Sequence, residues 1–248
     1  MTASTSVAIV VPTLQEGAQI GSAARRLAAD FPDCELVVVD GGSTDDTVAQ
    51  AQPYARVLTS APGRAVQMNT GAKATAADVL WFVHADVRLD RAALQQIRAA
   101  LVDERVIGGG LSLAFDRRSR ALDLLARASN ARARRLHQIF GDQSMFVRRS
   151  VFDGIGGFPE LPLMEDFELT RRLHRAGRLV LLPATSTASA RRFDTHGTVP
   201  MIAFMQCLKL AYLAGMSPQR IHDLYRAGPP VRRRARTSDG ARHAPAAH

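Results

Sequence analysis

The class of fold is indicated by the segment Leu36-Val-Val-Val-Asp-Gly-Gly-Ser-Thr-Asp-Asp-Thr47. Four apolar residues end on Asp40, and two glycines and a run of small polar residues follow. This order is typical of a buried strand that leads through a tight turn into a helix. Ligands of open α/β sheets bind at the carboxyl ends of the strands, so we expect Asp40 at a binding edge. Gly41 and Gly42 would let a ligand come close to the backbone.

A second strand repeats this arrangement further along the chain. Val79–Val83 is apolar, and His84-Ala85-Asp86 follows it directly. Because parallel strands end at the same edge of a sheet, Asp40 and Asp86 should lie on one rim. Two carboxylates on one rim predict a site for a cationic or metal-bridged ligand.

Strands and helices alternate through the first half of the chain. Val7–Val11 reads as a buried strand that Pro12 stops, and residues 18–30 have the apolar spacing of a helix. Residues 91–102 form a second helix of this kind, with apolar side chains on one face. This alternation predicts an α/β fold, in which a mostly parallel central sheet is flanked by helices.

The second half of the chain is less regular. Gly108-Gly-Gly110 precedes a predicted strand at residues 111–115, and a helix rich in arginine is predicted over residues 119–139. A short strand at residues 179–182 and an apolar helix at residues 199–215 follow. We expect this half to be packed against the first half rather than to repeat it.

The composition fits one large domain and a tail. Of the 248 residues, 46% are hydrophobic, which is enough for one full core. We predict a domain over residues 1–227, with a nucleotide-binding half of about residues 6–105 and an acceptor half of about residues 106–227. Residues 228–248 carry five arginines against one aspartate, and we expect them to form a disordered basic tail.

Charge and cysteine content bound the partners and the compartment. The net charge is +9, but no aromatic residues alternate with the arginines of the tail, so we expect no nucleic-acid partner. A solvated tail and a weak attraction to anionic lipid both remain open. Cys34 and Cys207 lack metal-site spacing and fit a reducing compartment. With no signal peptide and no apolar run of ~18 residues, we expect a cytoplasmic protein, with peripheral contact at the inner face of the membrane as an alternative.

Five motifs in order resemble glycosyltransferase family 2, which has the GT-A nucleotide-sugar fold. The resemblance covers about residues 6–226 and is strongest to small, single-domain bacterial members of that family. No single motif is specific, but their order and spacing are. The motifs are Pro12-Thr-Leu-Gln-Glu16, Val39–Thr47, Gly63-Arg64 with Asn69-Thr-Gly71, His84-Ala-Asp86 and Glu165-Asp166.

The resemblance implies an inverting glycosyltransferase of the hexosyltransferase kind, assisted by Mg²⁺ or Mn²⁺. The expected donor is a nucleotide diphosphate sugar, a UDP-sugar in our interpretation, and the acceptor is unknown. A hard divalent cation neutralises the diphosphate leaving group and needs few protein carboxylates. By the resemblance, Asp86 is the metal ligand, and His196 is a second candidate. His84 stands where the family carries a first aspartate, and it either contacts the sugar or ribose or packs at the strand end.

The resemblance also places a nucleotide-sugar site. Local readings compete with it: Glu16 could be a helix-start carboxylate, Asp40 a turn cap, and Arg64 a solvated cation. Gly41 stands where many relatives carry a second aspartate, which weakens any inference about the base. The implied donor-site residues are Pro12, Thr13, Glu16, Asp40, Gly41, Gly42, Ser43, Gly63, Arg64, Asn69, His84, Ala85, Asp86, Asp142, Gln143, Arg191 and Arg192.

Glu165 and Asp166 are the implied catalytic pair. By the resemblance, Asp166 is the general base that takes a proton from the acceptor as it attacks the anomeric carbon. A carboxylate in the first turn of a helix is also what stabilisation by the helix dipole would favour, and this reading weighs more for Glu165.

Two other classes of function compete with this interpretation. A non-catalytic nucleotide-sugar-binding module could keep the fold without turnover, although the intact Glu165-Asp166 pair argues against it. A nucleotidyltransferase would need a glycine-rich basic loop after the first strand, whereas Pro12–Glu16 is acidic.

The helix predicted at residues 199–215 is more apolar than one buried face requires. Gln206 and Lys209 are the strongly polar residues of its central part. Three arrangements remain open: the helix is enclosed within the monomer, it forms a homodimer, or it contacts a membrane surface.

Overall fold

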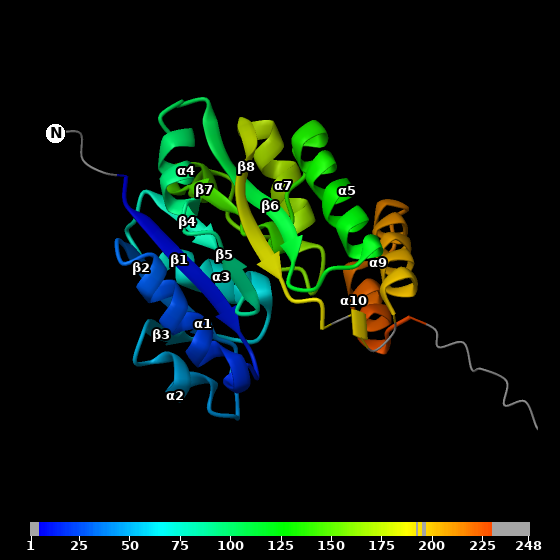
Figure 1. Cartoon of the computed structure of the whole chain (residues 1–248), viewed down its shortest axis with the longest axis horizontal. Helices are drawn as coiled ribbons and strands as arrows, with labels where there is room; N and C mark the ends of the chain where they lie inside the picture. Colours follow the sequence, from blue (N-terminus) through cyan, green and yellow to red (C-terminus); the bar gives the residue numbers. More distant parts are fainter. Residues whose placement is uncertain (1–4, 192, 195–196, 230–248) are drawn as a thin grey trace, which may run out of the picture.

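The structure, a computed structural model, describes residues 5–191, 193–194 and 197–229. Arg192, His196 and nearly all of the predicted basic tail therefore lie outside the described residues. The described elements, labelled as in Figure 1, are β1 (Val7–Thr13), α1 (Gly17–Asp30), β2 (Cys34–Asp40), α2 (Thr47–Ala51), β3 (Arg56–Thr59), α3 (Arg64–Lys73), β4 (Val79–Phe82), β5 (Val87–Leu89), α4 (Ala93–Ala100), β6 (Val106–Phe115), α5 (Arg120–Leu136), the short 3-10 helix η1 (Gly141–Gln143), β7 (Phe146–Arg148), α6 (Arg149–Gly154), α7 (Glu165–Ala176), β8 (Arg178–Ala188), α9 (Thr198–Leu213) and α10 (Pro218–Ala227).

A mostly parallel sheet forms the centre of the molecule, as the sequence predicts (Figure 1). Its strand order is β3-β2-β1-β4-β7-β6-β8-β5. The strands β1, β2, β3 and β4 pair in parallel, as do β6 and β8, whereas β7 and β5 run antiparallel to their neighbours. Short β7 therefore joins the first half of the chain to the second, and the carboxyl ends of β1, β2 and β4 share one edge.

The two faces of the sheet carry separate hydrophobic cores. Ile9 of β1 packs in one core with Ile20 of α1, whereas its neighbour Val10 packs in the other core with Met68 of α3. Successive side chains of a strand point to opposite faces, so an unbroken apolar run is what a sheet covered on both sides requires. Trp81 of β4 is fully buried, and its indole N–H donates to the carbonyl of Ser144, 3.0 Å away.

The prediction that Pro12 stops the first strand is wrong. β1 continues through Pro12 and pairs with β2 as far as Thr13. The pairing of β1 with β4 ends earlier, at Val10 and Phe82. Backbone groups of alternate residues face the same neighbour, so the position of Pro12 faces the side of β4, beyond the end of that strand. The N–H that proline lacks would have had no strand partner there.

The predicted boundaries of two later strands are also wrong. The glycines at 108–110 do not precede a strand but lie within β6, which begins at Val106. A Cβ on Gly108 would lie 2.5 Å from the carbonyl oxygen of Phe146, so the packing of the neighbouring strand requires glycine there. The strand predicted at residues 179–182 extends to Ala188 as β8. The elements β5, α6 and α10 were not predicted.

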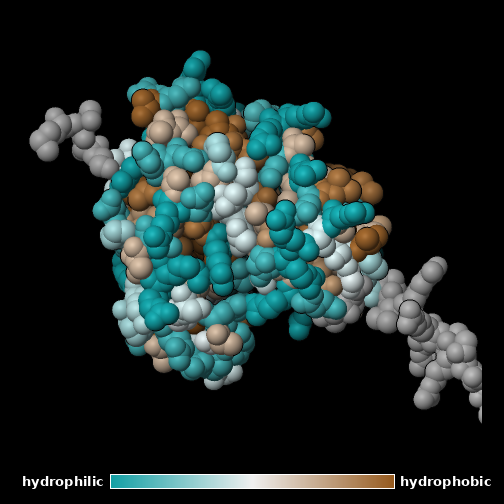
Figure 2. Space-filling view, in the orientation of Figure 1, coloured by the Kyte–Doolittle hydropathy of each residue, from teal (hydrophilic) through white to brown (hydrophobic). Residues whose placement is uncertain are grey.

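The apolar helix predicted at residues 199–215 is α9, and it is partly enclosed. Met201 and Leu208 are buried, and the helix packs against α5 and α10. Val199, Leu210 and Leu213 are exposed, at 61–66%. Figure 2 shows hydrophobic residues gathered at the edge of the molecule where Figure 1 places α9. Within the described part of the chain, none of the helices has both the length and the apolar character needed to cross a membrane.

Candidate active site

A cavity of about 1180 Å³ lies between the two halves of the chain. Its polar side chains come from the loops that follow β1, β4 and β8, from the starts of α3 and α7, and from η1, α5 and α9. Its apolar wall comes mainly from α5 and α9. Seven of the sequence-predicted site residues line it: Glu16, Arg64, His84, Asp86, Asp142, Asp166 and Arg191.

The end of β4 presents Asp86 to this cavity. Ala85 is buried and Asp86 is exposed, which turns the carboxylate away from the core. His84 also lines the cavity. Its ring packs closely against Gly141 of η1: a Cβ added to Gly141 would lie 2.8 Å from the Nε2 atom of His84. The structure therefore packs His84 at the strand end and leaves it facing the site.

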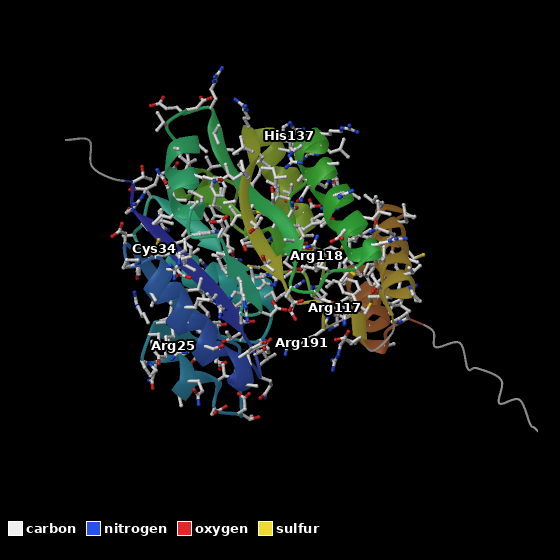
Figure 3. All side chains as sticks on the ribbon, in the orientation of Figure 1. Arg25, Cys34, Arg117, Arg118, His137 and Arg191 are labelled. Carbon is white, nitrogen blue, oxygen red and sulfur yellow. The ribbon has the colours of Figure 1, made fainter. Side chains whose placement is uncertain are left out.

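Glu16 adds a second carboxylate near Asp86. Burial raises the pKa of Glu16, and the charge of Asp86 adds to this rise, whereas the hydrogen bond from Gln19 and the charge of Arg191 oppose it. Arg191 follows the end of β8 and donates to Gln19 of α1. Arg117 and Arg191 lie on one side of the molecule, beyond the paired ends of β6 and β8 (Figure 3). The loop after β8 thus brings a cation to the acidic edge of the N-terminal half.

The start of α7 carries the predicted catalytic pair. Met164, the residue before it, has a left-handed backbone with φ of 70°. Such a conformation in a non-glycine residue costs of order 1–3 kcal/mol and is found most often at functional sites. Ser144, which follows η1, is also left-handed, at 46°. Both strained residues flank segments that supply side chains to the cavity.

Glu165 is buried and forms an ion pair with Arg64, at 2.7 Å. Burial raises the pKa of Glu165 to about 7, and the Arg64 guanidinium opposes part of this rise. The other carboxylate oxygen of Glu165, Oε2, is buried without a hydrogen-bond donor among the described residues. Glu165 does not line the cavity, so its direct role is to hold Arg64, which does.

Asp166 faces the cavity and is held by backbone donors. Its Oδ2 accepts a hydrogen bond from Gly141 N–H at 2.9 Å, and its Oδ1 accepts one from Phe167 N–H at 2.7 Å. These two backbone donors hold both oxygens of the carboxylate in place at the start of α7. The side chain is therefore oriented, and one side of it remains toward the cavity.

Asp40 performs a structural task at the end of β2. Its Oδ2 accepts from Gly42 N–H at 2.9 Å and from Ser43 N–H at 2.8 Å, and Ser43 Oγ donates to Oδ1. The side chain is 2% exposed and does not line the cavity. The turn-cap reading of Asp40 is thus present in the structure, while contact with a nucleoside stays a prediction.

Gln67 is a buried residue that the sequence analysis did not single out. Its side-chain amide donates to the carbonyls of Thr13 and Val39, at 2.6 and 2.9 Å, and so ties the ends of β1 and β2 together. A Cβ on Gly41 would lie 3.2 Å from this amide, so Gly41 packs closely on it. Its signal in the sequence is a polar residue three positions after Arg64, on the same face of the helix.

Four further predicted residues have structural contacts. The amide of Asn69 both donates to and accepts from the backbone of Phe158, at 2.9 Å each, and ties α3 to the loop before α7. Gln143 is fully buried and accepts from the backbone of Phe140 at 3.3 Å. Gly63 precedes α3 with φ of 135°, and Thr13 is buried at the end of β1.

Several residues that line the cavity were not predicted from the sequence. Arg132 of α5 and Lys209 of α9 line it, together with Phe140 before η1. The sequence marks Lys209 as a rare charge in an apolar helix. Nothing in the sequence separates Arg132 from the other arginines of α5.

The family of this chain follows from comparison with known families. Residues 8–156 match the model of "Glycosyl transferase family 2". The chain belongs to glycosyltransferase family 2. The matched region contains Asp40, Asp86 and Asp142, and it ends before Asp166 and α9. No curated protein matches this family 2 chain.

Solved structures of similar fold are also glycosyltransferases. A mannosyltransferase PcManGT from Pyrobaculum calidifontis, in complex with GDP-Man and Mn²⁺, has a TM-score of 0.63 and 19% identity, covering 89% of this chain and 68% of that one. Glucosyl-3-phosphoglycerate synthase from Mycobacterium tuberculosis, in complex with Mn²⁺, UDP and glucosyl-3-phosphoglycerate, has a TM-score of 0.62 and 21% identity, covering 86% and 81%. S. aureus TarS 1–349 in complex with UDP-GlcNAc has a TM-score of 0.59 and 18% identity, covering 87% and 69%. The predicted GT-A fold of this glycosyltransferase is confirmed.

Proposed function

We propose that this glycosyltransferase moves a hexose from a nucleotide diphosphate sugar, a UDP-sugar, to an acceptor nucleophile with inversion at the anomeric carbon. The observation that carries the proposal is that Asp86 and Asp166 line one cavity from opposite halves of the chain. One carboxylate serves the donor, and the other serves the acceptor. The complexes of similar structures with GDP-Man, UDP and UDP-GlcNAc support a nucleotide-sugar donor.

The residues at the end of β4 fit a divalent cation. Asp86 is an exposed carboxylate at the cavity, and Glu16 is close enough for its pKa to respond to the charge of Asp86. Mg²⁺ and Mn²⁺ prefer oxygen ligands and use few protein carboxylates when phosphates complete the shell. Among the described residues there is no group of three or more metal-binding side chains, which agrees with a cation held largely by the donor. When bound, such a cation neutralises charge on the leaving diphosphate.

Asp166 is proposed as the general base. The acceptor would approach from the side of α5 and α9 and lose its proton to Asp166 as it attacks the anomeric carbon. Attack on the face opposite the diphosphate inverts the configuration in one displacement. The Gly141 N–H bond fixes the carboxylate, and a base must be oriented in this way before it can act.

Arg64 and Glu165 are proposed to act as a unit. Glu165 holds the guanidinium at the cavity, where a planar cation suits phosphate oxygens. Arg191 is proposed to assist from the loop after β8. The predicted contributions of Arg192 and His196 stay predictions, because both residues lie outside the described part of the chain.

The turn after β2 is proposed as the nucleoside side of the site. Asp40 already accepts three hydrogen bonds within the turn, but a carboxylate offers about four acceptor positions. A uracil N–H would use the remaining one only after the turn moves, because Asp40 is 2% exposed and does not line the cavity. The two free cysteines, Cys34 and Cys207, fit a reducing cytoplasm, which we propose as the location.

A panel of sugar nucleotides tests this function. Binding to the folded state raises its stability with the logarithm of ligand concentration over Kd, so thermal unfolding with and without Mn²⁺ identifies the donor. The donor that stabilises the protein should then release its nucleoside diphosphate in the presence of acceptor extracts. Stabilisation without any release would instead support a non-catalytic binding module.

A further inference from the structure

Two cations of the cavity meet at one aromatic ring. The guanidinium carbon of Arg132 lies 4.0 Å from the ring centroid of Phe140, and Nζ of Lys209 lies 4.3 Å from it. Arg132 projects from α5 and Lys209 from α9, so two separate helices bring the charges together. Among the described ion pairs, none includes either cation.

Two guanidinium nitrogens of Arg132 lack a hydrogen-bond acceptor within the described part of the chain. Its Nε and Nη2 atoms are buried, and no acceptor among the described residues reaches them. A buried N–H donor of a charged group that is left without an acceptor is unfavourable, and a cation–π contact offsets only part of that free energy. The arrangement is therefore incomplete by itself, and an anionic ligand would supply the missing acceptors.

The charges of the cavity fall into two groups. Burial lowers the pKa of Arg132 and of Lys209, and the carboxylates that oppose this lowering are Asp142 and Asp166. At the other end, Glu16 responds to Asp86 and Arg191. The two cations thus lie near Asp166, the proposed base, as does Arg64, but they come from α5 and α9 on the proposed acceptor side.

An apolar wall continues from the two cations to the surface. Leu124 and Leu125 of α5 and Val199, Ile202 and Met205 of α9 line the same cavity. Leu124 is 68% exposed and Val199 is 66% exposed, so the wall extends to solvent. A fully polar acceptor would leave this surface without a contact.

We propose that Arg132 and Lys209 form an anion subsite for the acceptor, and that the acceptor is an amphipathic molecule with a phosphate or carboxylate group. Its anionic group binds the two cations beside Phe140, and its apolar part lies along α5 and α9. The inference rests on the proposed function, because it names the acceptor class of the same site. The anionic molecule is either a lipid headgroup or a free amphiphile, since both present the same chemistry.

Calorimetry with octyl phosphate, octan-1-ol and inorganic phosphate tests the subsite on the full chain with UDP and Mn²⁺ present. Octyl phosphate should bind more tightly than either of the other probes. Its affinity should fall at least about tenfold in Arg132→Gln and in Lys209→Gln, the scale of a lost charged hydrogen bond. Arg134→Gln is the matched control, because Arg134 is exposed on α5 and does not line the cavity. Arg132→Lys and Lys209→Arg keep the charge if the neutral variants fail to fold.

Binding of UDP with Mn²⁺ is measured in parallel and separates the two claims. If UDP binds to every variant but octyl phosphate binds equally well to the wild type and both neutral variants, the subsite is wrong and the proposed function stands. If the neutral variants lose UDP affinity instead, the cations serve the donor and the inference is overturned. If the wild type does not bind UDP, the proposed donor fails independently of the subsite. Cosedimentation with phosphatidic acid vesicles that is lost in Arg132→Gln supports a lipid source, and octyl phosphate binding without cosedimentation supports a free amphiphile.

Discussion

The carboxylate of Asp86 is exposed, but the backbone on both sides of this residue is held in place by packing. Ala85 before it is buried, and Val87 after it begins β5, which pairs with β8. The carboxylate is therefore presented at a fixed place on the edge of the cavity. A cation bound there would be shared with the phosphates of the donor, because the described residues bring no group of three or more metal-binding side chains together.

Substitution of Asp86 by asparagine should weaken Mn²⁺-dependent binding of the UDP-sugar and leave the fold intact. The amide keeps the size of the side chain but removes the charge that attracts a divalent cation. Calorimetric titration of UDP in the presence of Mn²⁺ measures the change. Asp153→Asn, at an exposed position outside the cavity, is the control, and equal affinity of Asp86→Asn and wild type would refute the assignment.

Glu165 should make the stability of the protein depend on pH. Its pKa is raised from 4.5 to about 7 in the folded state, mainly by burial, so the folded state binds more protons than the unfolded state between these values. The free energy of unfolding therefore falls as the pH rises from about 4.5 to about 7. The variant Glu165→Gln lacks this pH-dependent contribution to the free energy of unfolding. Between pH 4.5 and 7, the stability of the variant relative to wild type should therefore rise by up to about 3 kcal/mol. Urea unfolding at several pH values measures it, and a constant difference would show that Glu165 is charged throughout.

At the scale of helices and strands, the sequence pattern predicted the strands that are apolar throughout because both of their faces are buried. β1, β2 and β4 are apolar runs between two covered faces, and the predicted carboxylates Glu16, Asp40 and Asp86 stand at or just beyond their ends. The end of β1 and the start of β6 were predicted wrongly, because Pro12 and the glycines at 108–110 were read as breaks, and β8 was predicted too short. Whether a strand can contain a proline or a glycine depends on the packing of the neighbouring strand. The residues next to it in the sequence do not carry that information.

Some residues of the site could be predicted from local sequence, and others could not. Asp86 and Asp166 were predicted because each has a fixed relation to a strand end or a helix start. Gln67, Arg132 and Lys209 were not, because their roles depend on contacts between distant segments. For Arg132, only its position against Phe140 separates it from the other arginines of α5.

The packing of α3 on the sheet depends on Gly71. A Cβ there would overlap Val10 of β1 and would lie 3.0 Å from Val39 of β2. In Gly71→Ala, overpacking should cost about 1–3 kcal/mol of the free energy of unfolding. The higher helix propensity of alanine offsets about 1 kcal/mol of this cost. Gly154→Ala, in α6 with open space around its Cβ, is the matched control and should be neutral or stabilising. Chemical denaturation of both variants checks this, and equal stabilities would contradict the close packing.

At the scale of the whole molecule, α9 leaves apolar surface uncovered. Val199, Leu210 and Leu213 are exposed, while Met201 and Leu208 fill the inner face. We expect this surface to contact a second one, either a twin subunit or an anionic membrane. Light scattering at micromolar concentration should show a dimer, or else vesicles with anionic lipid should sediment the protein. A monomeric mass without vesicle binding would contradict this expectation.

Two halves of one chain meet in a single cavity, and we propose that Asp86 serves the donor and Asp166 the acceptor. The most direct test is to compare nucleotide binding and turnover in Asp166→Asn and wild type, with the sugar nucleotide that wild type uses. We predict unchanged affinity for UDP with Mn²⁺ and a loss of diphosphate release of about 10²-fold or more, the usual scale for a positioned general base. Near wild-type turnover in Asp166→Asn would contradict the account and make Asp166 a structural residue.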